Sequence, residues 1–160
     1  MDFSKMLDEE LIFVQKTFPS KEDAIRFLSG ELIKKDMVKG SFLDAVLSRE
    51  KKYPTGIYIG SINVAIPHTD IKHVKKSGVA ILTLKKPVKF NRMDSPNEEI
   101  PVHIIFLLAV SEPDEYVKFL SRLTRSFGKQ GIIEKIYTGK NINNIYKILQ
   151  GVLKDKEEAT

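Results

Sequence analysis

The chain has 160 residues, of which 42% are hydrophobic and 29% charged, a composition typical of one globular domain with a single core. The absence of cysteine excludes disulfides, thiolate metal ligands and a cysteine nucleophile. The net charge of +5 comes from lysines scattered along the chain, so we expect no nucleic-acid partner. No apolar run approaches the ~20 residues that span a bilayer, and the first residues lack the pattern of a signal peptide. We therefore expect a cytoplasmic protein without direct membrane insertion.

The predicted elements of the N-terminal part begin with a β-rich run at residues 11–14, which indicates a strand. Ser20 stands three residues before Asp23, a spacing close to that of a capping box, and predicts the start of a helix. The buried stripe of this helix would contain Ala24, Phe27, Leu28 and Leu32. Ser41 is expected to cap a second helix that ends near residue 51. Its inward side chains would be Phe42, Ala45 and Val46.

The middle of the chain predicts strands. The β-rich runs cover residues 58–59, 62–66, 78–84, 87–90 and 102–110. We expect a turn at residues 54–56, a second turn at Lys85 and Lys86, and a polar loop over 91–99. The last β-rich run is nearly all apolar, which predicts a central strand covered on both faces.

The C-terminal part changes to a helical pattern at Asp114. Three apolar stripes predict helices that end near Gly128, near Gly139 and near residue 153. The charged tail at residues 154–160 is expected to fray. Because strands and helices are mixed without a linker or repeat, we predict one α/β layered domain over residues 1–153.

The segment around His68 carries the strongest chemical signal. An apolar strand stops at Pro67, whose ring stiffens the backbone that leads into His68. Thr69 and Asp70 follow, and such side chains can select which ring nitrogen of a histidine carries the proton. The chain has only three histidines: His68, His73 and His103. We interpret His68 as the candidate nucleophile.

Other chemistries find little support in the sequence. Phosphate-binding P-loops, dinucleotide-binding Gly-x-Gly-x-x-Gly motifs and Gly-x-Ser-x-Gly nucleophile elbows are absent, and no cofactor is indicated. His68, Asp70 and His73 could contribute metal ligands, but a zinc site normally needs three or four ligands and no obvious remainder exists. We therefore predict no metal site. His103 lies in a predicted buried strand and is interpreted as a core or edge residue.

A nucleophilic histidine would most readily carry a phosphoryl group. Imidazole titrates near neutrality, so its neutral form is available at cellular pH. A bound phosphoryl group adds a charge of about −2 and favours a nearby guanidinium, for which Arg49 is the candidate. The Thr69 hydroxyl and backbone N–H groups could add donors. Structural explanations remain open, because an arginine at a helix C-terminus is satisfied by the helix dipole and Thr69 and Asp70 are common turn residues.

Three segments together resemble a known family. They are Arg49-Glu50, the Tyr-Pro-Thr-Gly-Ile run at residues 53–57, and Val-Ala-Ile-Pro-His-Thr-Asp at residues 64–70. They are similar to enzyme IIA domains of the bacterial phosphoenolpyruvate-dependent sugar phosphotransferase system, in the fructose–mannitol class. The strand at residues 101–109, followed by an acidic helix start, extends the resemblance over roughly residues 5–153.

The resemblance implies a three-layer α/β/α sandwich around a mixed β-sheet. It also implies that His68 accepts a phosphoryl group from the carrier HPr and passes it to a cysteine of enzyme IIB, which serves the membrane enzyme IIC. Arg49 matches the arginine near the active histidine, and the family suggests phosphorylation at Nε2. Thr69, Asp70 and His73 would be supporting residues.

One departure narrows the resemblance. Mannitol- and fructose-type members typically carry a second histidine where this chain has Tyr116. The Pro-Thr-Gly run and His73 look more like the galactitol-type branch, so a galactitol-like sugar or sugar alcohol is expected. Two alternatives stay open: a nitrogen-type regulatory protein whose phosphorylation state controls a partner, and a metal-dependent α/β protein of another kind.

Overall fold

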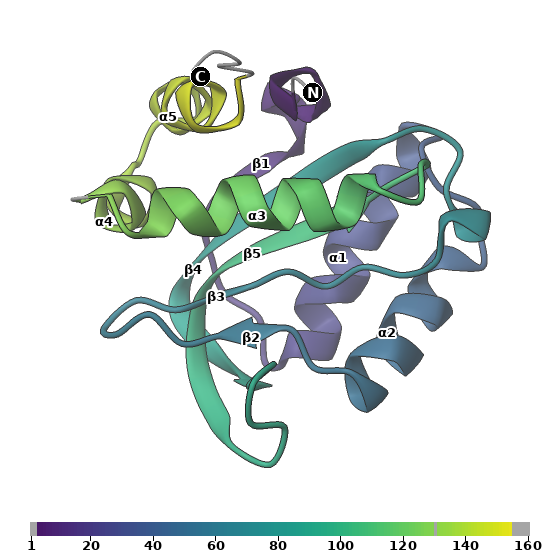
Figure 1. Ribbon diagram of the computed structural model, residues 1–160, viewed down its shortest axis with the longest axis horizontal. Coiled ribbons are helices and arrows are strands. Elements are labelled where there is room, and N and C mark those ends of the chain that lie inside the picture. Colours follow the sequence, from purple (N-terminus) through teal and green to yellow (C-terminus); the bar gives the residue numbers. More distant parts are fainter. Residues whose placement is uncertain (1–2, 130, 155–160) are drawn as a thin grey trace.

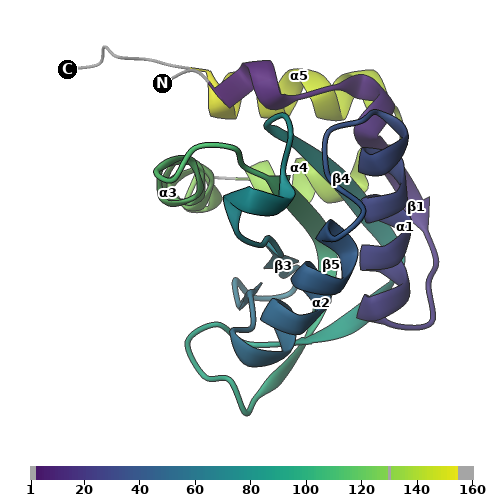
Figure 2. The ribbon, with the colours of Figure 1, turned by 90° about the vertical axis from the view of Figure 1, so that its right-hand side faces the viewer.

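A mixed β-sheet lies between two layers of helices in the computed structural model, which describes residues 3–129 and 131–154 (Figures 1 and 2). The strands are β1 Ile12–Lys16, β2 Gly56–Ile57, β3 Val64–Ala65, β4 Gly78–Asn91 and β5 Glu99–Ala109. Their order in the sheet is β1-β4-β5-β3-β2. β1 pairs parallel with β4 and β3 pairs parallel with β5, whereas β4–β5 and β2–β3 are antiparallel.

The helices divide between the two faces of the sheet, and Figure 2 shows α3 on one side of the strands and α1 on the other. One layer contains α1 Lys21–Lys34 and α2 Phe42–Lys52, and the other contains α3 Glu115–Phe127, α4 Ile132–Thr138 and α5 Ile142–Leu153. Three short 3-10 helices complete the described elements: η1 Phe3–Met6, η2 Glu9–Leu11 and η3 Ile71–His73. The expected three-layer α/β/α sandwich is confirmed. Within the described ranges, no helix is long and apolar enough to cross a membrane.

Each face of the sheet has its own hydrophobic core, because strand side chains alternate between the two faces. On β5, Ile105 and Leu107 pack in the cluster of α1 and α2. Their neighbours Ile104 and Phe106 pack in the cluster of α3, α4 and α5. β5 is the middle strand of the sheet, so the expectation of a central strand covered on both faces is confirmed.

The predicted helices form, with a difference at each of the first two. At α1, the Ser20 hydroxyl oxygen accepts a hydrogen bond from the Asp23 N–H at 3.2 Å, as the capping pattern predicts. Ile25 joins the buried stripe of this helix, and Phe27 is only half-buried. Ser41 does precede α2, but the prediction that its side chain caps the helix is wrong. Its hydroxyl instead hydrogen-bonds Nδ1 of His73 at 2.8 Å.

The predicted turn at Lys85 and Lys86 is wrong, because β4 continues through both residues to Asn91. Pairing with β5 shifts register between Thr83 and Val88, and the two lysines lie exposed on this irregular stretch. The bulge bends the strand without ending it. Figure 1 shows β4 and β5 curving together below the main sheet.

The strands before His68 are shorter than predicted. Only Gly56–Ile57 and Val64–Ala65 pair in the sheet, so β2 starts within the predicted 54–56 turn. The Asn63 side-chain oxygen accepts hydrogen bonds from the N–H groups of Ile59 and Gly60, at 2.7 and 3.0 Å. This closes a loop where the sequence predicted strand. Of the tail predicted at residues 154–160, residues 155–160 lie outside the described residues.

Candidate functional site

His68 lies just beyond the carboxyl end of β3, where the chain leaves the sheet. The Pro67 carbonyl still accepts a hydrogen bond from Leu108 of β5 at 3.0 Å, so Pro67 continues the line of β3. On the other side, the Ile66 N–H donates to the Thr55 carbonyl at 3.3 Å. The backbone leading into His68 is therefore held on both sides, in addition to the stiffness that Pro67 gives it.

Two contacts hold the imidazole of His68. Nδ1 lies 3.2 Å from the Ile66 carbonyl oxygen. The ring also stacks on that of Tyr116, with 3.6 Å between centroids and 21° between planes. Since a carbonyl can only accept, Nδ1 carries the hydrogen and Nε2 keeps its lone pair. The nucleophilic atom of the neutral ring is therefore Nε2.

The surroundings of His68 favour the uncharged ring. Burial is the largest effect and, together with the charge of Arg49, lowers the pKa of His68 from 6.5 to about 4. The Ile66 hydrogen bond and the charge of Asp70 act in the opposite direction. With a pKa of about 4, the imidazole is neutral over the whole physiological pH range, the form in which its free nitrogen is nucleophilic. His68 is 8% exposed.

Arg49 brings a cation with unused donors to the site from the last turn of α2. Its Nη1 lies 3.9 Å from a carboxylate oxygen of Asp70, a loose ion pair. Its Nε is buried and has no hydrogen-bond partner among the residues that the structure describes. Its guanidinium also lies over the Tyr53 ring, 5.3 Å from the centroid. A guanidinium with a free buried N–H can donate a hydrogen bond to an incoming anion. The favourable charge of Arg49 at the C-terminus of a helix does not by itself explain why this N–H is buried without a partner.

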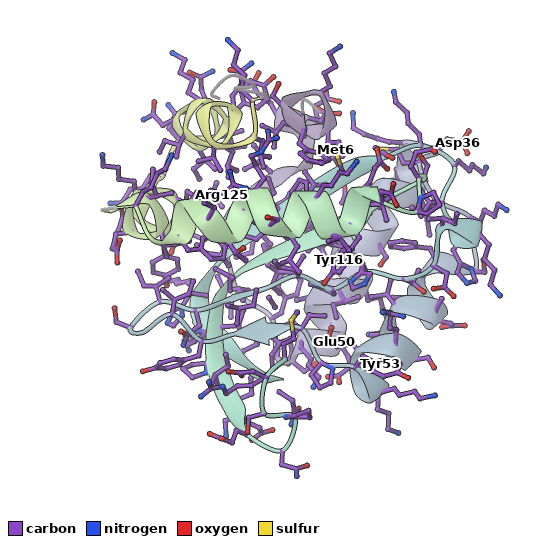
Figure 3. All side chains as sticks on the ribbon, in the orientation of Figure 1. Met6, Asp36, Glu50, Tyr53, Tyr116 and Arg125 are labelled. Carbon is purple, nitrogen blue, oxygen red and sulfur yellow. The ribbon has the colours of Figure 1, made fainter. Side chains whose placement is uncertain are left out.

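Glu50, beside Arg49, ties α2 to β2. Its two carboxylate oxygens accept hydrogen bonds from the Thr55 N–H at 2.8 Å and from the Thr55 hydroxyl at 2.7 Å. Burial raises the pKa of Glu50, and these two hydrogen bonds oppose the rise. Thr55 in turn holds Ile66, whose carbonyl orients His68. In Figure 3, Glu50 and Tyr53 lie at the end of α2, with Tyr116 above them at the start of α3.

The roles of Glu50 and Tyr116 were not predicted from the sequence. Glu50 follows Phe42 and Val46 at intervals of four residues, and all three are buried on one stripe of α2. An acidic residue on such a stripe signals a buried, hydrogen-bonded carboxylate. The sequence singles out the position of Tyr116, but the contact of this residue with His68 depends on the packing of α3.

The supporting residues proposed from the sequence have different surroundings in the structure. Thr69 is buried next to His68, and Asp70 is exposed and faces Arg49. His73 is in η3, where its hydrogen bond with Ser41 and that of its carbonyl with the Lys39 N–H tie it to the start of α2. These contacts indicate a structural role for His73.

His103 lies on β5, as expected for a core or edge residue. Its Nδ1 accepts a hydrogen bond from the Asn63 N–H at 3.2 Å, and its ring meets Tyr137 edge-to-face at 5.3 Å. Burial lowers its pKa. Across residues 3–129 and 131–154, no three His, Asp or Glu side chains gather as a metal-binding group.

A scan against family models matches residues 5–152 to the family described as phosphoenolpyruvate-dependent sugar phosphotransferase system, EIIA 2. The galactitol-specific EIIA component of Escherichia coli is 27% identical over 122 residues, which cover 76% of this chain and 81% of the relative. The multiphosphoryl transfer protein 1 of Escherichia coli is 30% identical over 151 residues, which cover 93% of this chain and 17% of that longer protein.

The fold is also similar to that of a solved complex. In the structure of the mannitol enzyme IIA with phosphorylated enzyme IIB from Escherichia coli, the matching chain has a TM-score of 0.76 and 24% identity. The match covers 91% of this chain and 97% of that one. At this identity the likeness concerns the fold.

Proposed function

Because the chain belongs to the EIIA 2 family of the phosphoenolpyruvate-dependent sugar phosphotransferase system, and so is a phosphotransferase component, we propose that His68 is its phosphoryl carrier. The observation that carries the proposal is the environment of the imidazole. The ring is buried, its Nδ1–H is bound to the Ile66 carbonyl, and its lone pair is on Nε2. Arg49 lies close enough to contribute to the low pKa of His68.

The proposed transfer needs no group beyond these residues and a phosphorylated donor. Nε2 of His68 attacks the phosphorus of a donor phosphohistidine, and a new N–P bond forms as the donor N–P bond breaks. The electron pair of the broken bond stays on the donor imidazole, which then takes up a proton. In the second step a cysteine thiolate attacks the phosphorus, and His68 regains its lone pair. Such transfers depend chiefly on positioning and on charge stabilisation.

Arg49 is proposed to stabilise the phosphoryl group in both steps. Its buried Nε–H is without a partner in the described part of the chain, and its Nη1 holds Asp70 only at 3.9 Å. A phosphoryl oxygen can replace Asp70 as the partner of a guanidinium fork, because two parallel hydrogen bonds to an anion are stronger than one loose ion pair. Thr69, which is buried and follows His68 in the chain, is proposed to add its hydroxyl as a further donor.

We propose HPr as the phosphoryl donor and a cysteine of enzyme IIB as the acceptor. Enzyme IIB in turn serves the membrane enzyme IIC. The solved relative in complex with phosphorylated enzyme IIB supports the second partner. The galactitol-specific relative supports a galactitol-like sugar or sugar alcohol as the transported substrate. A protein with these partners acts in the cytoplasm.

The test is phosphorylation of the purified chain by phosphoenolpyruvate, enzyme I and HPr. We expect one phosphate on the wild type and on the His73→Ala and His103→Ala controls, and none on His68→Ala. Labelling of His68→Ala equal to that of the wild type would contradict the proposal. Adding a galactitol-type enzyme IIB should then discharge the phosphorylated protein; a labelled protein that no enzyme IIB discharges would favour the regulatory alternative.

A further inference from the structure

We propose that Tyr116 is a positioning residue whose ring holds the imidazole of His68 in one plane, with Nε2 directed to the partner. The inference rests on the proposed function of His68 and adds to it the residue that orients the nucleophile. Tyr116 belongs to the first turn of α3, on the opposite side of the sheet from α2 and Arg49 (Figures 1 and 2). The two helical layers thus each contribute one side chain to His68.

The geometry shows what Tyr116 adds to the hydrogen bond. The bond from Nδ1–H to the Ile66 carbonyl fixes one edge of the imidazole, at 3.2 Å, but a single bond leaves the ring free to tilt about it. The Tyr116 ring lies 3.6 Å from the imidazole with only 21° between the planes, so it covers one face. An edge contact and a face contact together define the plane of the ring. The lone pair of Nε2 lies in the plane of the ring, so neither the hydrogen bond at Nδ1 nor the stack on the ring face engages it.

The position of Tyr116 is itself fixed by its neighbour Glu115. One carboxylate oxygen of Glu115 accepts hydrogen bonds from the Ser77 hydroxyl at 2.6 Å, the Ser111 N–H at 3.0 Å and the Glu112 N–H at 3.1 Å. Ser77 directly precedes β4, and Ser111 follows β5 after one residue. The first turn of α3 is therefore anchored to the central strands, and the Tyr116 ring is placed by the sheet.

Tyr116 acts on His68 by shielding its ring from water, because the charges near His68 belong to other residues. Arg49 faces His68 from α2, and Asp70 faces it from the segment after β3. Burial raises the pKa of Tyr116 to about 12, with Arg49 lowering it and Glu50 raising it further. The phenol is therefore uncharged at physiological pH. Tyr116 acts on His68 by excluding water from one face of the ring, which agrees with burial as the main cause of the low pKa of His68.

The test compares Tyr116→Phe, Tyr116→Trp and Tyr116→Leu by NMR titration of the His68 ring nitrogens in the unphosphorylated protein. Phe and Trp keep a flat face, and Leu keeps apolar volume without one. We expect the pKa of His68 to stay near 4 and the tautomer to stay protonated at Nδ1 in the Phe variant. In the Leu variant we expect the pKa to rise by about one unit or more and the two tautomers to mix.

Phosphorylation rates provide the second readout. We expect the Phe variant to be phosphorylated within about threefold of the wild-type rate and the Leu variant about tenfold more slowly, with Trp between them. An unchanged His68 pKa, tautomer and rate in the Leu variant would overturn the inference. Equal losses in Phe and Leu would also overturn it, because they would assign the effect to the hydroxyl.

Two controls keep the outcomes distinct. Thermal unfolding monitored by circular dichroism establishes that each variant is folded, and the Trp variant tests the ring face if Leu destabilises α3. The NMR titration needs no phosphoryl donor. If His68→Ala still accepts phosphate, the proposed function fails while the titration still decides whether Tyr116 positions the imidazole.

Discussion

At the scale of single residues, three neighbours determine the chemistry of His68. The Ile66 carbonyl selects the tautomer, Tyr116 covers the ring, and Arg49 supplies a positive charge. The same burial that keeps the imidazole neutral also keeps water away from the phosphoryl group that it is proposed to carry. A neutral ring with one free nitrogen is the form that can accept a phosphoryl group from another histidine.

Arg49→Ala should slow phosphorylation of His68 about 10- to 100-fold, since a charge-assisted hydrogen bond contributes about 1.5–3 kcal/mol. The rate of Arg49→Lys should fall between those of the wild type and Arg49→Ala, because lysine keeps the charge but loses the planar fork. Stopped-flow or quenched-flow transfer from phosphorylated HPr measures both. Since Arg49 is half-buried at the end of α2, unfolding curves should verify that both variants are folded. Wild-type rates in Arg49→Ala would remove this residue from the site.

His68 should also make stability depend on pH. The unfolded chain binds a proton at His68 near pH 6.5, whereas the native ring binds it only near pH 4. Between these values the unfolded state holds more protons, so stability is fully present above pH 6.5 and falls as the pH drops. The loss due to this group is about 3 kcal/mol by pH 4.

His68→Gln is the matched control for this effect. Urea unfolding of both proteins at pH 7, 6, 5 and 4 should show the wild type losing about 3 kcal/mol more than the variant. The comparison cancels Glu50, whose raised pKa works in the opposite direction by favouring the native state as the pH falls. Parallel stability curves would mean that His68 titrates alike in both states.

At the scale of elements, short polar connections join the helices to the strand ends. Glu50 locks the end of α2 to the start of β2 through Thr55, and Glu115 locks the start of α3 to Ser77 and Ser111. β3 pairs over only Val64–Ala65, so the backbone at His68 depends on these connections more than on a long strand ladder. The first connection reaches the imidazole through Ile66 at its Nδ1 edge, and the second reaches it through Tyr116 on its face.

Thr55→Val should destabilise the protein more than Glu50→Gln. Valine leaves one buried oxygen of Glu50 without its donor, which costs about 1–3 kcal/mol. Glutamine at position 50 can accept from the Thr55 N–H and donate to the Thr55 hydroxyl, so its cost should stay under about 1 kcal/mol. Urea unfolding at pH 7 gives both values. Equal costs would show that the Thr55 hydroxyl does not hold the carboxylate.

The sequence predicted elements that depend on local signals and missed those that depend on partners. The Ser20 cap and the apolar periodicity are local signals, and α1, α3 and α5 form as expected, although Val117 in the apolar pattern of α3 is exposed. The bulge in β4 near Lys85 is different, because it arises from the register with β5. A pair of lysines between apolar runs is equally compatible with a turn and with an exposed bulge.

At the scale of the whole molecule, the site forms where the two helical layers meet the end of β3. Arg49 comes from one helical layer, Tyr116 from the other, and His68 from the segment that follows β3. That Arg49 lies near His68 could be predicted from the sequence, because both residues lie in short recognisable runs. The Tyr116 stack could not, since it joins segments 48 residues apart through the packing of α3 on the sheet.

The most direct test of the central claim is NMR of the phosphorylated protein labelled with nitrogen-15 at histidine. We predict one phosphorus signal coupled to Nε2 of His68, with Nδ1 still protonated against the Ile66 carbonyl. The signals of His73 and His103 should keep their unphosphorylated nitrogen shifts. A phosphate on Nδ1 of His68, or on either of the other histidines, would contradict the account.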